Sequence, residues 1–277
     1  MKVVKHSGMV VDFDRNKLNA SLLKSGADVA TVDAVLLAIE NELYEGISTK
    51  QIYKLAFSRL KKSANSHAAR YNLREALRLL GPAGFFFEKY IARLFAAEHY
   101  ETRTNLVLQG HCVTHEIDVA IQKDKTVSMI ECKFHSGREA NSDVKVPMYI
   151  LSRFNDLKNE SHSIFSKKDA ISSCWIITNN RFTTDAISFA SCMGMNLLSW
   201  DYPKKNNLRD KIDSHHLYPI TCLTTLSFAE KDRLLVMDCI LVKELVYKTE
   251  LLEHIGLSSS RMKNVIKEVT ELCRLYA

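Results

Sequence analysis

No long hydrophobic run is present. A stretch of about 18 apolar residues occurs nowhere in the chain, so we predict no membrane-spanning helix and no membrane partner. The opening stretch, MKVVKHSGMVVDFDRNKL, lacks an apolar segment followed by a cleavage site, which argues against a signal peptide. Internal repeats and low-complexity segments are also missing. These absences favour an ordinary globular protein of the cytoplasm.

Two small motifs are absent as well. No Cys-x-x-Cys pair occurs, and the cysteines are seven, an odd and scattered set, so we expect reduced thiols rather than a disulfide framework or a zinc knuckle. No G-x-x-x-x-G-K-[ST] sequence occurs, which gives no support for ATP hydrolysis of the Walker type.

The composition is that of a folded protein with a mild basic excess. Hydrophobic residues make up 46% and charged residues 25% of the chain, which is ordinary for globular proteins. The formal net charge of +6 is compatible with a polyanionic partner but does not require one.

The order of predicted elements divides the chain into three regions and places it in the α/β (α+β) class. Residues 1–80 read as a short hairpin followed by helices, and Gly81-Pro82-Ala83-Gly84 marks a boundary. Residues 81–205 alternate strands and helices, as expected for a mixed sheet flanked by helices. Residues 203–216 are polar and link this region to the third, residues 206–277, which is predicted to be helical.

The segment HEIDVAIQKDKTVSMIECKF (115–134) predicts a β-hairpin with three charged residues that need an explanation: Asp118, Glu131 and Lys133. A two-residue turn at Asp124-Lys125 places Asp118 directly opposite Glu131, with Cβ atoms roughly 4.5–5.5 Å apart. Lys133 shares the face of Glu131 because strand side chains alternate. A three-residue loop would shift this register.

Two facing carboxylates repel one another unless something positive lies between them. Mg²⁺ (or Mn²⁺) held by Asp118 and Glu131 fits this chemistry, since Mg²⁺ prefers carboxylate oxygens and water. Lys133 is then placed to orient a water or to stabilise charge at phosphorus. The alternative is a polar sheet face on which Lys133 forms a salt bridge with Glu116 or Glu131.

The order of these residues resembles the PD-(D/E)xK nuclease superfamily, and within it the Mrr-like restriction endonucleases. The matching parts are the helix GFFFEKYIARLF with Glu88, the acid Asp118, the run Glu131-Cys132-Lys133 and the closing segment ITNNRFTTDAISFASCMGMNLLSW. The resemblance implies a metal-dependent DNA endonuclease in which Glu88 supports the metal. HEID replaces the usual Gly-rich approach to the acid, which leaves the substrate open.

Two histidines near this hairpin do not form a metal pair. His111 and His115 lie about 13 Å apart on an extended strand, at roughly 3.3 Å per residue, too far to share one ion.

The first residues, VVKHSGMVVDFDRNKLNASLLKSGA, resemble the ATP-cone domain. The matching positions are Val3, Lys5, Gly8, Phe13, Asp14 and Lys17. The resemblance implies binding of ATP or dATP, with Lys5 and Lys17 at the phosphates and with Val4 and His6 on the same hairpin.

The charge of this region suits a phosphate ligand, because residues 1–80 hold 13 Lys and Arg against 8 Asp and Glu. His6-Ser7 stands where family members often have Arg-Asp, which leaves affinity and nucleotide choice open. The alternative is a small helical domain without a ligand.

The C-terminal segment LLEHIGLSSSRMKNVIKEV predicts two helices joined by a Gly turn. Arg261 and Lys263, close to the Ser258–Ser260 helix start, are candidates for contacts with the DNA backbone. The alternative is a helical cap on the nuclease core.

The sequence therefore predicts a Mg²⁺-dependent deoxyribonuclease acting on DNA and regulated by ATP or dATP. A non-catalytic, nucleotide-responsive DNA-binding regulator with a degenerate nuclease fold is the alternative. A nuclease for RNA or branched DNA is a third reading, and a homo-oligomer is left open.

Overall fold

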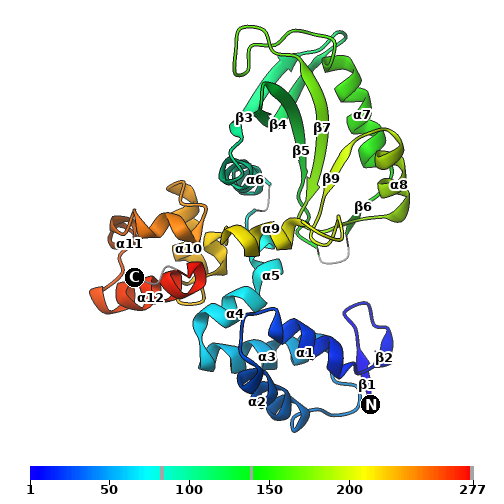
Figure 1. Ribbon diagram of the computed structural model, residues 1–277. Helices are drawn as coiled ribbons and strands as arrows, with labels where there is room; N and C mark the ends of the chain where they lie inside the picture. The colour runs from blue at the N-terminus through cyan, green and yellow to red at the C-terminus, as the bar shows by residue number, and fades with distance from the viewer. Residues whose placement is uncertain (82–83, 138–139, 275–277) are drawn as a thin grey trace. The chain divides into compact units, whose positions relative to one another are not determined.

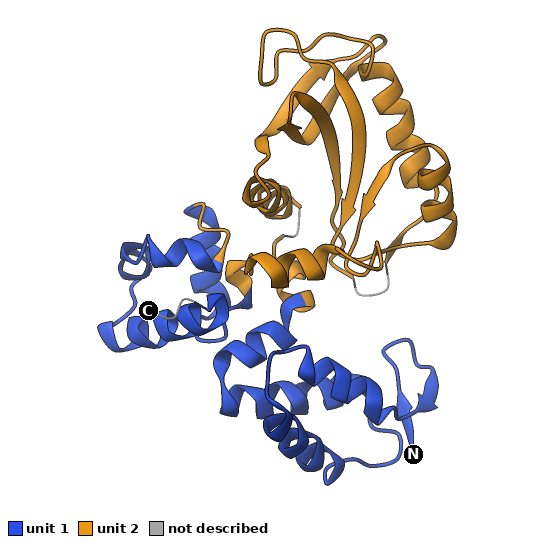
Figure 2. Ribbon diagram, viewed as in Figure 1, with its two compact units in different colours: residues 1–73, 222–237, 242–277 blue, residues 74–221, 238–241 orange. Residues whose placement is uncertain are grey.

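The computed structural model describes residues 1–81, 84–137 and 140–274. Contacts divide the chain into two compact units (Figure 2): residues 1–73, 222–237 and 242–277 form unit 1, and residues 74–221 and 238–241 form unit 2. The predicted mixed α/β class is confirmed, with helices flanking a sheet and a helical C-terminal region. Of the predicted boundary at Gly81–Gly84, Pro82 and Ala83 lie outside the described residues.

The N-terminal part of unit 1 is a β-hairpin followed by helices (Figure 1). Its elements are β1 (Lys2–Val4), β2 (Val10–Asp12), α1 (Arg15–Leu23), α2 (Val29–Glu40), α3 (Thr49–Ser63) and α4 (Asn65–Tyr71). Asp14, Asp28 and Ser48 cap α1, α2 and α3, because each side chain accepts a hydrogen bond from a first-turn amide. The apolar sides of these helices pack with β1 into one core.

The C-terminal part of unit 1 is helical. It contains α10 (Phe228–Val236), η2 (Val242–Val246), α11 (Glu250–His254) and α12 (Ser259–Cys273). Gly256, at a φ of 84°, and the capping residue Ser258 form the predicted turn between α11 and α12. Arg70 of α4 donates to the main-chain carbonyls of Glu271 and Leu272, so α4 and α12 are tied together within this unit.

Unit 2 is built on a five-stranded mixed sheet in the order β3-β4-β5-β7-β9. Its elements are α6 (Phe85–Ala97), β3 (Glu101–Gln109), β4 (Thr114–Lys123), β5 (Thr126–Lys133), β6 (Asn141–Ser142), α7 (Lys145–Leu157), β7 (Ile171–Thr178), β8 (Arg181–Phe182), α8 (Thr184–Cys192), β9 (Asn196–Leu198), α9 (Leu208–His215) and η1 (Ile220–Cys222). The first three strands pair antiparallel and the last three parallel. In Figure 1, α6 lies on one side of the sheet and α7 and α8 on the other.

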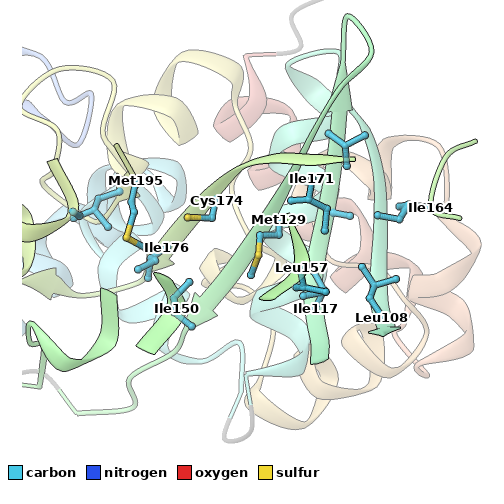
Figure 3. Packing of buried hydrophobic residues seen from close by; sticks show 14 of the residues in the cluster. Leu108, Ile117, Met129, Ile150, Leu157, Ile164, Ile171, Cys174, Ile176 and Met195 are labelled. Carbon is cyan, nitrogen blue, oxygen red and sulfur yellow. The ribbon is translucent and has the colours of Figure 1, made fainter. Parts of the chain in front are cut away.

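The core between the sheet and α7 consists of close-packed aliphatic and sulfur-containing side chains (Figure 3). Met129 from β5 and Ile176 from β7 are fully buried there with Ile150 of α7. On the other side of the sheet, Phe95 of α6 meets Trp175 edge-to-face, with ring centroids 5.6 Å apart. The central strands β5 and β7 are thus covered on both faces.

Two expected elements differ from the structure. Residues 203–216, expected as a linking segment, contain α9, because Leu208 and Ile212 bury on one side of an otherwise polar helix. The last of the helices expected within residues 1–80 is divided into α4 and α5 (Leu73–Arg78), since the chain departs from helical geometry at Asn72.

No cysteine of the described residues forms a disulfide, and Cys112 and Cys192 are exposed. Among the described residues, no helix has both the length and the apolar character needed to cross a bilayer.

Candidate active site

The β4–β5 hairpin has the predicted two-residue turn. Asp124 and Lys125 both adopt left-handed backbone angles, with φ of 50° and 65°, the geometry of a type I′ turn. The register runs from Lys123↔Thr126 to Val119↔Ile130, so the predicted pairing is confirmed over these positions. One position further, the Cys132 amide donates to Asp118 Oδ2 over 2.7 Å, which places Asp118 beside the end of β5.

Glu131 is a buried carboxylate held by two cations. Its side chain is 7% exposed, and burial of an unpaired charge there would be costly. Lys133 Nζ donates to Oε1 over 2.6 Å, and Arg153 Nη1 donates to Oε2 over 2.5 Å. The salt bridge between Lys133 and Glu131, one of the two alternatives that the sequence left open, is therefore present. A cation entering the site displaces at least one of these contacts or shares an oxygen with it.

Asp118 is the less compensated acid of the pair. Burial, then the nearby Glu131 charge, raises the pKa of Asp118 to about 7, against the opposing effect of the Cys132 hydrogen bond and the Lys133 charge. Its carboxylate accepts no other hydrogen bond from the described part of the chain. The arrangement leaves one carboxylate oxygen available to a proton or a metal ion.

Glu88 lies in the first turn of α6, after Gly84 at a φ of 86°. Burial raises the pKa of Glu88, and the charges of Glu116 and Glu131 raise it further. Phe87 packs against Phe134, with ring centroids 5.8 Å apart, so this turn of α6 is fixed next to the end of β5. The structure therefore brings Glu88 within electrostatic reach of Glu131.

The donor chemistry of this group suits a hard divalent cation. Asp118, Glu131 and Glu88 offer carboxylate oxygens only, the ligands of Mg²⁺ and Mn²⁺, and their mutual repulsion is what a cation relieves. In the conformation described here the three carboxylates do not form a closed cluster, since residues 1–81, 84–137 and 140–274 contain no group of three or more metal-ligating side chains gathered around one point. Asp118 and Glu131 would hold the ion, with water completing the coordination.

Sequence reasoning missed Arg153, which comes from α7. Its side chain is 10% exposed, with Nη1 on Glu131 and Nη2 on the main-chain carbonyl of Glu116. A signal was present: Arg153 lies three residues after Ile150 and four before Leu157, on the apolar side of α7. An arginine on a buried helix side needs an acidic partner.

The loop after β5 is held by neighbouring polar side chains. The His135 amide donates to Asn179 Oδ1 over 2.8 Å, and Asn179 Nδ2 donates to the His135 carbonyl over 2.9 Å. Asn180 Nδ2 donates to the carbonyls of Gly137 and Ala140. These bonds fix the residues that follow Lys133.

The two histidines near the hairpin have other partners. His115 Nε2 lies 2.8 Å from Asp156 of α7, and His111 lies 3.5 Å from Glu160. The Asp156 carboxylate also accepts from the amides of Cys112 and Val113. These contacts attach the β3–β4 loop to α7.

The four cone residues lie on two neighbouring elements of unit 1. Val4 ends β1, Lys5 and His6 are exposed in the hairpin turn, and Lys17 is exposed in the first turn of α1. Asp14, from the same motif, accepts a hydrogen bond from the Lys17 amide over 3.0 Å. The ammonium groups of both lysines therefore lie at the surface of unit 1.

The two C-terminal candidates differ in their contacts. Arg261 forms an ion pair with both Glu230 oxygens, at 2.5 and 2.9 Å, and donates to the Thr225 carbonyl. Its guanidinium ties the start of α12 to α10. Lys263 is exposed on α12, so its ammonium faces solvent.

Three family models match successive parts of the chain. The model described as an ATP cone domain matches residues 1–77, the restriction endonuclease model Mrr_cat matches residues 82–202, and the model described as AF1548-like, C-terminal, matches residues 218–273. An uncharacterized protein of Archaeoglobus fulgidus is 34% identical over 183 residues, which are 66% of this chain and 99% of the relative.

A solved structure is also similar. A crystal structure titled as the protein of unknown function AF1548 has a TM-score of 0.56 and 33% sequence identity, covering 69% of this chain and 99% of that one. Neither relative's name assigns it an activity.

Proposed function

Since the chain belongs to the AF1548-like family and carries an ATP cone followed by a restriction endonuclease domain, we propose that it is a metal-dependent endonuclease that hydrolyses DNA phosphodiester bonds and is regulated by ATP or dATP. The observation that carries the proposal is the convergence of Asp118, in the middle of β4, with Glu131 and Lys133 at the end of β5.

The proposed mechanism assigns a separate task to each side chain. A divalent cation would supply polarisation of a phosphoryl oxygen and a lower pKa for a bound water. Asp118 and Glu131 would hold that cation, and Glu88 contributes negative charge from α6. The Lys133 side chain, 32% exposed, is placed to exchange its Glu131 contact for one with the substrate phosphate and to stabilise the charge that develops there.

Cleavage assays with matched variants test the proposal. Supercoiled plasmid, branched DNA and RNA are each incubated with the full chain and Mg²⁺ or Mn²⁺, alongside Asp118→Asn and Lys133→Ala. Asp124→Asn and Lys125→Ala, in the exposed turn of the same hairpin, are the controls. We expect DNA cleavage by the unaltered chain and both controls, and a loss of about 100-fold or more in the other two variants.

A non-catalytic, DNA-binding regulator is the alternative, and one observation favours it: both Glu131 oxygens already have cationic partners. Under that alternative no substrate is cleaved, and Lys133→Ala binds DNA as well as the unaltered chain does.

Lys263, exposed on α12, is the C-terminal residue we propose at the DNA backbone, since Arg261 is engaged by Glu230.

Nucleotide binding is proposed at the hairpin and first helix of unit 1, with Val4, Lys5, His6 and Lys17. Calorimetry with ATP and dATP measures it on the full chain. Lys5→Ala and Lys17→Ala are expected to weaken binding at least tenfold, whereas Lys62→Ala, an exposed lysine on α3, leaves it unchanged. Equal affinity in all variants would reject this site. Size-exclusion chromatography with and without nucleotide shows whether a homo-oligomer forms.

A further inference from the structure

Arg153 is a buried cation in contact with Glu131, one of the proposed catalytic acids. The guanidinium makes two contacts through different nitrogens. Nη1 donates to Glu131 Oε2 on β5, and Nη2 donates to the main-chain carbonyl of Glu116 on β4. Arg153 thus joins the two strands that carry the acids, at a point two residues before Asp118.

α7 gives this arginine a rigid base. Ile150 and Leu157 of the same helix are fully buried in the core of unit 2, so α7 has little freedom to slide. Tyr149, one turn earlier, has its ring centroid 5.7 Å from the Arg153 guanidinium carbon, which adds a cation–π contact. The guanidinium is therefore constrained on three sides, by a ring, a carboxylate and a carbonyl.

The two cations on Glu131 differ in access to solvent. The Lys133 side chain is 32% exposed and the Arg153 side chain 10%. Lys133, a flexible ammonium, can leave Glu131 for a phosphate, but Arg153 is enclosed and bound at both ends. When Lys133 moves, Arg153 still holds Glu131 and still balances its charge.

We propose that Arg153 is a positioning residue: by bridging the Glu131 carboxylate and the Glu116 carbonyl, it fixes the orientation of Glu131 relative to Asp118 before a cation binds. This inference rests on the proposed nuclease function. Partners of metal-binding carboxylates typically contribute about 10- to 100-fold to metal affinity or activity, and Arg153 is expected to fall in that range.

Metal affinity measured without substrate tests the inference. Mn²⁺ is titrated calorimetrically into the full chain and into Arg153→Lys and Arg153→Ala, with Arg181→Ala as control, since Arg181 is an exposed partner of Asp201 in the same unit. Lysine keeps the charge but cannot bridge two acceptors in a fixed fork. We expect Mn²⁺ affinity about tenfold lower in Arg153→Lys, lower still in Arg153→Ala, and unchanged in Arg181→Ala.

A kinetic readout separates positioning from substrate binding. The Mg²⁺ concentration for half-maximal cleavage is expected to rise about tenfold in Arg153→Lys, whereas KM for DNA at saturating Mg²⁺ stays the same. Circular dichroism shows whether each variant is folded. If Arg153→Ala does not fold, the Mn²⁺ affinity and Mg²⁺ dependence of Arg153→Lys are sufficient to test the inference. Unchanged Mn²⁺ affinity and Mg²⁺ dependence in Arg153→Lys would overturn the inference. If the unaltered chain neither binds Mn²⁺ nor cleaves any substrate, the proposed function itself fails.

Discussion

At the scale of single residues, the site is an unequal pair of acids. Glu131 is neutralised by Lys133 and Arg153, whereas Asp118 accepts one main-chain hydrogen bond and has a pKa raised to about 7. Under the proposed function, Asp118 is the acid at which a proton and a metal ion compete. In the metal-free protein it is also a source of instability at alkaline pH.

Replacing Asp118 by Asn is expected to stabilise the metal-free protein. The folded protein keeps a proton on Asp118 up to about pH 7, whereas the unfolded chain loses it near pH 4. Stability of the unaltered chain therefore falls as pH rises between these values, and Asp118→Asn removes this fall. We expect a gain on the order of 2 kcal/mol at pH 8 and almost none at pH 4.

Urea unfolding in EDTA at the two pH values measures this difference. Asp33→Asn, which alters an exposed acid on α2, controls for the loss of one negative charge. If Asp118→Asn is less stable than the unaltered chain at pH 8, the ionised Asp118 carboxylate does not destabilise the folded protein.

At the scale of elements, the type I′ turn sets the register that makes the site. Asp124 and Lys125 both have positive φ, which non-glycine residues adopt at a cost, and Asn-Gly is the favoured pair for such a turn. The double substitution Asp124→Asn, Lys125→Gly is expected to raise the free energy of unfolding by about 1 kcal/mol and to leave cleavage unchanged. Thermal unfolding and plasmid cleavage measure the two effects. A destabilised variant would show that the turn has a different geometry.

The sequence predicted this hairpin because its signals are local. Alternating apolar residues and a two-residue turn determine which positions face one another, so Asp118 and Glu131 were found without tertiary information. Arg153 was not, because its contact with Glu131 depends on how α7 packs on the sheet. Similarly, α9 was missed because only Leu208 and Ile212 mark its buried side.

At the scale of the whole molecule, the proposed regulation requires that nucleotide binding at residues 1–77 changes the activity proposed for residues 82–202. α5 begins where the first segment of unit 1 ends, since Leu73 belongs to unit 1 and Arg74 to unit 2. Within unit 2, Arg74 Nη2 donates to Asn180 Oδ1 over 2.5 Å, and Arg78 donates to the Ser136 carbonyl. Ser136 lies in the segment that follows Lys133, and Asn180 is hydrogen-bonded to the same segment. Both bonds therefore link α5 to the residues after Lys133.

The contacts of α5 predict that Arg74 transmits the nucleotide response. In Arg74→Ala, we expect ATP and dATP to bind as before and basal cleavage to persist, but the change in cleavage rate on adding nucleotide to fall by more than half. Cleavage with and without nucleotide, together with calorimetry, measures this. Arg59→Ala, which removes an ion pair with Glu42 in the cone, is the control. A full nucleotide response in Arg74→Ala would contradict this route.

The central claim is that β4 and β5 bring two carboxylates together to hold a divalent cation. A crystal of the full chain grown with Mn²⁺ tests it directly, because Mn²⁺ is located by its anomalous scattering. We predict a peak in contact with carboxylate oxygens of both Asp118 and Glu131, absent in Asp118→Asn. A structure in which Mn²⁺ binds elsewhere, with Lys133 and Arg153 still holding both oxygens of Glu131, would contradict the account.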